Sequence, residues 1–250
     1  MKKILTTLVV GAMLATAASA DFSRVEMGVG AWQQTPNGQI TYADSGDSFA
    51  DKSLEEEQSE GYVWMLIKHP IPIVPNLRLE YVSAVNEGKY IVETGTPIGT
   101  IPSGSLSELE MTQIDIIPYY NILDNTGWMT VDVGIDIKVI DIEYSANGVD
   151  ILEELDTDIS SIVIPLGYLR ARVEIPGTNL GVEADVKYVS YDSDTISDIR
   201  VKADYTLDFI PVVQPAIEIG YRVQTFDVED SGLKIDTEYK GVYAGLMVRF

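Results

Sequence analysis

The stretch MTVDVGIDIKV, from Met129 to Val139, decides the fold. Its odd-numbered residues are all apolar, whereas its even-numbered residues are Thr, Asp, Gly, Asp and Lys. Alternate side chains of a β-strand point to opposite faces, whereas a helix would spread these charges around its whole circumference. The stretch therefore predicts a strand with one apolar and one charged face. Such a strand fits a soluble sandwich, where the apolar face meets a core, and a membrane barrel, where it meets lipid.

The N-terminal segment predicts export. Lys2-Lys3 is followed by an apolar run over residues 4–15 and then by Ala18-Ser19-Ala20, which has the form of a signal-peptide cleavage site. The alternative, an N-terminal anchor helix, is short for a bilayer and ends in small residues. We predict that residues 1–20 are a cleaved signal peptide and that residues 21–250 form a single barrel domain.

Composition and charge exclude several classes of function. The absence of Cys excludes disulfides, thiolate chemistry, Cys-based metal sites and a lipid anchor on Cys. The formal net charge is −22, and it becomes −24 when Lys2 and Lys3 leave with the signal peptide. Such an acidic chain repels nucleic acid and suits a divalent cation or a basic surface. No segment after residue 20 has the length and apolarity of a transmembrane helix.

Alternation of apolar and polar residues recurs along the chain and predicts ten strands. We expect them at residues 24–34, 61–68, 77–83, 110–120, 129–144, 161–174, 180–189, 199–209, 216–225 and 239–250. Four connections are short and rich in Pro, Gly and Asn, namely residues 69–76, 122–127, 175–179 and 210–215. The others are longer and acidic, at residues 35–60, 84–109, 145–160, 190–198 and 227–238. Two of these contain expected hairpin tips, Asn37-Gly38 and Asn147-Gly148.

Short and long connections alternate along the chain. All turns should therefore lie at one end of the strands and all long loops at the other, with both termini at the turn end. This layout is typical of outer-membrane barrels. The predicted fold class is all-β: a transmembrane, antiparallel, up-and-down β-barrel of ten strands. Eight or twelve strands are the alternatives if a long loop has been misassigned.

The polar faces of the predicted strands carry a nearly balanced set of nine bases and eleven acids. Those predicted to line the lumen are Arg78, Glu80, Asp132, Asp136, Lys138, Arg170, Arg172, Glu183, Asp185, Lys187, Arg200, Lys202, Asp204, Glu218, Arg222 and Arg249. Glu26, Asp115, Glu174 and Asp208 complete the set. The surplus negative charge therefore belongs to the loops. A balanced set can pair inside a narrow lumen, which offsets the cost of burying charge.

Aromatic residues near the strand ends predict two interfacial girdles, although ordinary β-propensity also favours aromatic residues in strands. The turn-end girdle would comprise Tyr119, Tyr120, Trp128, Phe209 and Phe250. The loop-end girdle would comprise Trp32, Tyr144, Tyr188, Tyr191 and Tyr239. Phe250 follows apolar residues at alternate positions, and this ending resembles the assembly signal of Gram-negative outer-membrane barrels.

Several stretches resemble a family of small Gram-negative outer-membrane β-barrel proteins of unassigned function. They are GYVW (residues 61–64), HPIPIVPNLRLEY (69–81), YYNILDN (119–125), GYLRARVEIPG (167–177), IEIGYR (217–222) and the terminal MVRF. Together they span the chain after residue 20. The resemblance implies a barrel in the outer membrane and supplies no catalytic or binding residues.

The sequence offers little catalytic chemistry. Outer-membrane proteases and acyl hydrolases generally use a His with Asp or Ser at the external rim, and a nucleophile needs its base within hydrogen-bond reach. The one histidine, His69, falls in a predicted turn away from any barrel serine. Carboxylate pairs such as Asp132 and Asp136 are explained by pairing in the lumen. We therefore predict a protein that is not an enzyme and has no cofactor.

Acidic clusters and a GxG motif are the remaining candidates. Asp44, Asp47 and Asp51, followed by Glu55, Glu56, Glu57 and Glu60, offer oxygen ligands that suit Ca²⁺ or Mg²⁺, but their spacing matches no EF-hand loop. We expect diffuse divalent-cation binding there and no specific metal site. Gly28 and Gly30 form a GxG without a following helix, so we expect them to make room for long side chains and not to bind nucleotide.

These patterns predict a monomer in the outer membrane of a Gram-negative bacterium. Its expected partners are membrane lipid, lipopolysaccharide and the barrel-assembly machinery. The first predicted role is structural or in surface interaction, with acidic external loops and a charge-filled lumen. The alternative is a narrow channel or transporter for a small solute, because strand tilt and shear decide whether a wet path exists. A soluble sandwich is the rival fold.

Overall fold

The computed structural model describes residues 23–44, 47–51, 57–89, 104–123, 128–154, 161–192, 194–207, 213–230 and 232–250. The predicted signal peptide, Glu55, Glu56 and Asp208 lie outside these ranges, as do the side chains of Asp44, Asp47 and Asp51. Within the described ranges, no helix has the length and apolarity needed to cross a bilayer.

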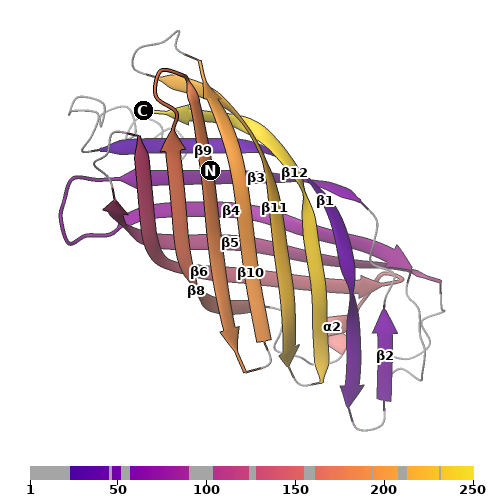
Figure 1. Cartoon of the computed structure of the whole chain (residues 1–250). Helices are drawn as coiled ribbons and strands as arrows, with labels where there is room; N and C mark the ends of the chain where they lie inside the picture. Colours follow the sequence, from indigo (N-terminus) through magenta and orange to yellow (C-terminus); the bar gives the residue numbers. More distant parts are fainter. Residues whose placement is uncertain are drawn as a thin grey trace, which may run out of the picture.

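The prediction of a ten-stranded, up-and-down antiparallel barrel is confirmed (Figure 1). The barrel strands are β1 (Arg24–Asp44), β3 (Gln58–Lys68), β4 (Asn76–Lys89), β5 (Leu106–Leu123), β6 (Met129–Ala146), β8 (Ser161–Glu174), β9 (Leu180–Tyr191), β10 (Asp194–Thr206), β11 (Gln214–Asp230) and β12 (Leu233–Arg249). Each pairs with its neighbour in the chain, and β12 pairs with β1, which closes the barrel. The smaller elements are β2 (Asp47–Asp51), β7 (Val149–Asp150) and α2 (Ile151–Glu154).

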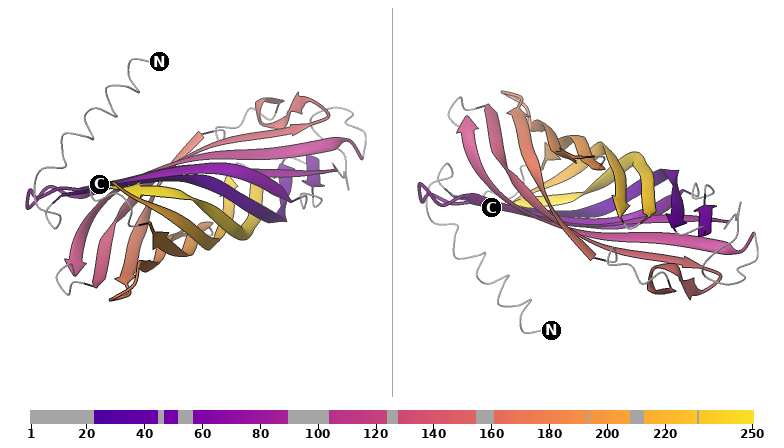
Figure 2. Two further views of the ribbon diagram at one scale, coloured as in Figure 1. Left: turned by 90° about the horizontal axis from the view of Figure 1, so that it is seen from above. Right: turned by 90° about the horizontal axis from the view of Figure 1, so that it is seen from below.

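The two ends of the barrel differ. The chain leaves β3, β5, β8 and β10 at the turn end, where Arg24 and Phe250 also lie. The loop end carries β2 and α2, at the lower right of Figure 1. In Figure 1, β3, β4 and β5 run at a large angle to β9, β10 and β11, and Figure 2 shows the same barrel from above and from below. Steep tilt of this kind is what closure of a small barrel requires.

Strand β6 contains the deciding stretch, and its faces lie as predicted. Asp132, Asp136 and Lys138 point into the barrel and are fully buried. Val133 and Ile135 point outward, and Ile135 is 56% exposed. The same division along the other strands leaves an apolar belt on the outside of the barrel. We define the belt by its exposed members: Val29, Val63, Tyr81, Ile114, Ile116, Val133, Ile135, Leu169, Val182, Ile199, Val201, Ile217, Ile219, Val242 and Leu246.

Beyond the belt, toward the loop end, the polarity of the two faces is inverted. In β6, Ile140, Ile142 and Tyr144 point inward and are buried, whereas Asp141 and Glu143 point outward. The strand continues without interruption, because its hydrogen bonds do not depend on which face is apolar. The same change occurs in the strands around β6. The interior at the loop end is therefore an apolar core, which we call the apolar cap: Ile40, Leu109, Met111, Ile140, Ile142, Tyr144, Ile151, Leu152, Ile196, Phe226, Leu233, Ile235 and Tyr239.

This inversion corrects the predicted long loops at residues 35–60, 84–109, 190–198 and 227–238. In the second of these, β4 continues to Lys89 and β5 begins at Leu106. Strand β1 continues to Asp44, so Asn37-Gly38 lies within the strand, opposite β12, and is not a hairpin tip. Residues 227–238 are mainly paired strand of β11 and β12, and β9 joins β10 through residues 192–193 alone. Outward acidic residues were interpreted as loop, although an acidic outer face over an apolar interior is compatible with a strand. Asn147-Gly148 is a hairpin tip as predicted, with φ of 54° and 76°.

The predicted girdles are partly wrong. Trp32, Tyr119, Tyr144 and Tyr239 point into the barrel and are almost completely buried. Alternation along the strand decides which face a side chain takes, and nearness to a strand end does not. Among the predicted girdle residues, Tyr120 and Trp128 near the turn end and Tyr188 and Tyr191 near the loop end are exposed. Phe209 lies outside the described residues.

The side chain of Gln34 links β1 to β4 beyond the point where β3 stops pairing with β4. β3 pairs with β4 only from Tyr62 to Ile67, although β4 continues to Lys89. The amide of Gln34 in β1 donates to the carbonyl of Ser83 (2.7 Å) and accepts from the backbone N–H of Val85 (3.2 Å). This amide reproduces the pair of backbone hydrogen bonds that a neighbouring strand would supply, and it links β1 to β4.

Candidate functional site

The candidate site is the charged interior between the turn end and the apolar cap. The structure places fifteen of the sixteen predicted lumen residues there, and none of the fifteen is more than 5% exposed. The sixteenth, Arg249, lies at the turn-end mouth and donates to Glu26 (2.8 Å). The interior is therefore packed with charged side chains.

Sequence reasoning missed two charged residues of this interior. The sequence predicts a loop over residues 190–198, but β10 begins at Asp194 and Asp198 is buried. It shares the inward face of β10 with Arg200 and Lys202, because the three residues are two positions apart. This spacing could have identified Asp198 from the sequence. Arg24, at the mouth, contacts Glu26. The predicted lumen-face residue Asp208 lies outside the described ranges.

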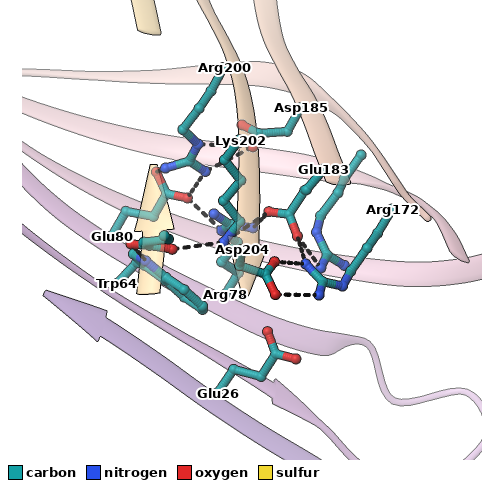
Figure 3. Close-up of polar contacts among 12 residues, drawn as sticks. Glu26, Trp64, Arg78, Glu80, Arg172, Glu183, Asp185, Arg200, Lys202 and Asp204 are labelled. Atoms are coloured by element: carbon teal, nitrogen blue, oxygen red, sulfur yellow. Dashed lines mark hydrogen bonds and ion pairs between the residues drawn. The ribbon is translucent and has the colours of Figure 1, made fainter. Parts of the chain in front are cut away.

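Glu183 is a hub of the charge network (Figure 3). It accepts from Arg170 (2.6 Å), Arg78 (3.2 Å) and Arg172 (3.5 Å), and its carboxylate is 3.6 Å from the ammonium of Lys202. Arg172 and Lys202 are its direct cross-strand partners in β8 and β10. Arg78 reaches it from β4, across the interior. One carboxylate therefore ties strands on both sides of the barrel.

Glu80 is a second hub. It contacts Arg78 on its own strand, and it accepts from Arg200 (2.7 Å) and Lys187 (2.7 Å), which belong to β10 and β9. Lys187 also contacts Asp115 of β5. Charge-assisted hydrogen bonds of this kind are roughly twice as strong as neutral ones when both partners are fixed. The two hubs link the sheet from β4 to β10 through side chains alone.

Two arginines make bidentate pairs. Arg172 donates to both oxygens of Asp204 (2.6 and 3.0 Å), and Arg222 donates to both oxygens of Asp198 (3.0 and 2.6 Å). Arg222 also lies over the ring of Trp32, 5.0 Å from its centre. The planar guanidinium suits both contacts, and a Lys could not reproduce the bidentate pair.

Trp64 supports the network from β3. Its indole N–H donates to Glu218 (3.0 Å), and the ammonium of Lys202 lies 4.2 Å from the ring centre. Lys202 in turn contacts Glu218 (3.1 Å). A Cβ added at Gly28 would lie 2.4 Å from the indole nitrogen. The prediction that this glycine makes room for a large interior side chain is confirmed.

Asp136 differs from the other interior acids. It is fully buried, and neither of its carboxylate oxygens has a hydrogen-bond partner among the residues that the structure describes. Leu166 lies directly opposite on β8, and Ile117 of β5 is also buried. The ammonium of the neighbouring Lys138 donates hydrogen bonds to Asp115 (2.6 Å) and Gln113 (3.3 Å) instead. Asp136 therefore lies near charged groups without binding any of them.

We predict that Asp136→Asn stabilises the barrel. A buried carboxylate without a partner is unfavourable, and the amide has the same shape without the charge. The free energy of unfolding should rise by on the order of 1 kcal/mol in a urea titration of the refolded protein. The matched control is Asp198→Asn, which removes a charge that Arg222 binds through both oxygens and should lower stability. Equal losses in both variants would contradict this interpretation of Asp136.

His69 lies in the turn-end connection, as predicted. Its Nε2 is 3.0 Å from the carbonyl of Pro75, and its Nδ1 accepts from the backbone N–H of Ile71 (3.2 Å). Both ring nitrogens of His69 therefore form hydrogen bonds within the turn. In the described part of the chain, no group of three or more acidic or His side chains is arranged to hold a metal ion.

The outer surface beyond the belt is acidic at the loop end. Glu87 lies directly opposite Glu108, and Glu110 lies opposite Glu143. Like charges in such cross-strand pairs are unfavourable. Burial and the negative charges of Glu110 and Glu87 also raise the pKa of nearby Glu60. This surface therefore favours a cationic partner.

No protein-family model matches the chain, and no curated protein matches its sequence. Solved structures do match. The outer membrane protease OmpT from Escherichia coli is 12% identical, over 94% of this chain and all of OmpT, with a TM-score of 0.48. The translocator domain of the autotransporter NalP from Neisseria meningitidis is 11% identical, over all of this chain and 96% of that domain, with a TM-score of 0.41.

A FadL homologue from Pseudomonas aeruginosa also matches, at 13% identity over 91% of this chain and 64% of its own, with a TM-score of 0.28. These proteins differ in function, and a likeness at such identities concerns the fold alone. The interior contacts described above are therefore the evidence on which function is argued.

Proposed function

We propose that this protein spans the outer membrane of a Gram-negative bacterium as a non-conducting barrel and acts through its loop-end surface. The membrane location is supported by the apolar belt, which surrounds the barrel and lies outside its hydrogen-bonded wall. Soluble monomers rarely expose contiguous apolar surface of this extent. The resemblance to small outer-membrane barrels of unassigned function agrees with this location.

One observation carries the non-conducting role: in the part of the chain that the structure describes, the inward charged side chains of the interior are almost completely shielded from solvent. A conducting pore keeps its lining in contact with water. Here the fifteen inward charges are at most 5% exposed, and all of them except Asp136 bind other side chains of the interior. The apolar cap then fills the interior at the loop end. An ion entering from the turn end would meet first a paired network and then an apolar barrier.

We propose that the protein is not an enzyme. A catalytic base has to reach the group that it activates, and both ring nitrogens of His69 are bound within a turn at the opposite end from the loops. The interior carboxylates, apart from Asp136, are bound to cations or to amide and aromatic donors. The charged interior therefore serves to hold the barrel together.

The remaining parts of the proposal concern partners. The loop end would face the cell exterior, where its acidic outer surface lies beside lipopolysaccharide and attracts divalent cations diffusely. Phe250 would serve in recognition by the barrel-assembly machinery. The closed interior and complete belt are consistent with a monomer. The two hubs would make the wall rigid, so that the loop-end surface is presented on a fixed support.

Liposome swelling tests the non-conducting role. The refolded protein is inserted in vesicles, insertion is verified by protease protection, and the vesicles are diluted into isosmotic solutions of small sugars. We expect swelling no faster than in protein-free vesicles, whereas a porin assayed in parallel should give rapid swelling. Swelling that depends on sugar size would instead support the alternative role, a narrow channel for a small solute.

A further inference from the structure

The connection between β3 and β4, residues 69–75, exposes apolar side chains at the turn end. Ile73 is 90% exposed, and Ile71 and Val74 are also exposed. The segment HPIPIVP contains no Asp, Glu, Lys or Arg, in a chain with 39 acidic residues. An aqueous turn would be expected to carry polar residues, so this composition needs a physical reason.

The exposed side chains are held in place by their backbone. Ile73 has a φ of 83°, in the left-handed region that a β-branched residue adopts only under constraint. Pro70, Pro72 and Pro75 fix three further φ angles. The imidazole of His69 binds the backbone at both ends of the segment. Such strain persists only where the surrounding structure enforces it, and it is common at functional positions.

The turn is tied to the outer wall of the barrel. Tyr120 points outward from β5, beside Val133 of the belt, and its hydroxyl donates to the carbonyl of Ile73 (2.6 Å). Tyr120, which holds the turn, therefore faces away from the interior of the barrel. This contact places Ile73 at the turn-end edge of the belt and outside the mouth of the barrel.

We propose that Ile71, Ile73 and Val74 insert into the periplasmic leaflet of the outer membrane and anchor the turn end there. This inference rests on the proposed membrane location and adds a lipid contact to it. A lipid surface fits the patch because it accepts apolar side chains without a shaped pocket, and because the patch continues the belt. Tyr120 suits the boundary, since its ring is apolar and its hydroxyl is hydrogen-bonded.

Spin labelling tests the anchor, because a chain without Cys allows single labels. Three variants are labelled with a nitroxide and refolded into phosphatidylethanolamine–phosphatidylglycerol vesicles: Ile73→Cys in the turn, Ile135→Cys in the belt, and Pro176→Cys at the tip of another turn. Accessibility to oxygen and to a water-soluble nickel complex gives the depth of each label. We expect nickel accessibility at residue 73 to be several-fold lower than at residue 176.

The controls separate the two proposals. If residue 135 is deep and residue 73 is as accessible to nickel as residue 176, the anchor is wrong and the membrane location stands; a periplasmic protein partner would then be the explanation for the apolar turn. If residue 135 is itself accessible to nickel, the membrane location fails. Val74→Cys is the second label in the turn and should report the same depth as Ile73→Cys.

Discussion

Replacing Ile135 with Arg should prevent or strongly weaken insertion of the barrel. Ile135 points outward from the middle of the belt and is 56% exposed. At mid-membrane an outward Arg costs about 2–4 kcal/mol, whereas at an exposed site of a water-soluble protein a substitution usually changes stability by about 0.5 kcal/mol or less. The variant therefore distinguishes a barrel whose belt faces lipid from the same barrel with its belt in water. Folding into vesicles, followed by urea titration, measures the difference.

The matched control lies on the same strand and the same face. Glu143 points outward from β6, eight residues beyond Ile135 and past the inversion of polarity. Glu143→Arg should fold and insert as the unaltered protein does, and it removes the like-charge contact with Glu110. Similar small effects of the two substitutions, together with recovery of the unaltered protein in the soluble periplasm, would contradict the membrane location.

The second large effect is expected from Glu183→Gln. Glu183 is 1% exposed and lies within 3.6 Å of four cationic groups. Removing one partner of a buried ion pair typically costs about 3–5 kcal/mol, because the remaining charge stays buried without compensation. Gln keeps the size of the side chain and loses the charge, so packing is not the variable. Urea titration of the refolded barrel measures the loss.

Glu174→Gln is the control for Glu183→Gln. Glu174 also binds Arg172 (2.8 Å), but it lies at the turn-end mouth and its side chain is 43% exposed. Solvent-screened pairs contribute about 1 kcal/mol or less. If the two variants lose equal amounts of stability, the interior charges do not form the compensated network described here.

Strand β6 shows how far the sequence predicts this fold. Period-two alternation gave the strand and the face of each residue from Met129 to Val139, and the same pattern gave the ten-stranded barrel. The inversion after Lys138 was missed because Ile140, Ile142 and Tyr144 keep the same period; only the face that is apolar changes. Acidic segments were predicted to be loops, although part of each is strand with an acidic outer face. The predicted strands are therefore too short at the loop end.

The interior contacts were less predictable than the fold. The alternation of side chains along each strand identifies which charged residues point inward. Extended to the true start of β10, it would have included Asp198. It does not identify partners such as Glu80 and Arg200, which are 120 residues apart and meet across the barrel. Those pairings depend on strand tilt and shear, which the sequence pattern does not specify. The lack of a partner for Asp136 follows from the same geometry, because the nearby Lys138 and Lys187 bind acids of other strands.

Single-channel recording tests the central claim, a closed interior, most directly. Purified protein is refolded, inserted in a planar bilayer, and verified to be inserted by protease protection in parallel vesicles. The account predicts no discrete current steps over a range of voltages, because paired charges and the apolar cap leave no aqueous path. Reproducible steps that change when Arg170, Arg172, Arg200 or Lys202 is neutralised would contradict it and would establish a channel lined by these residues.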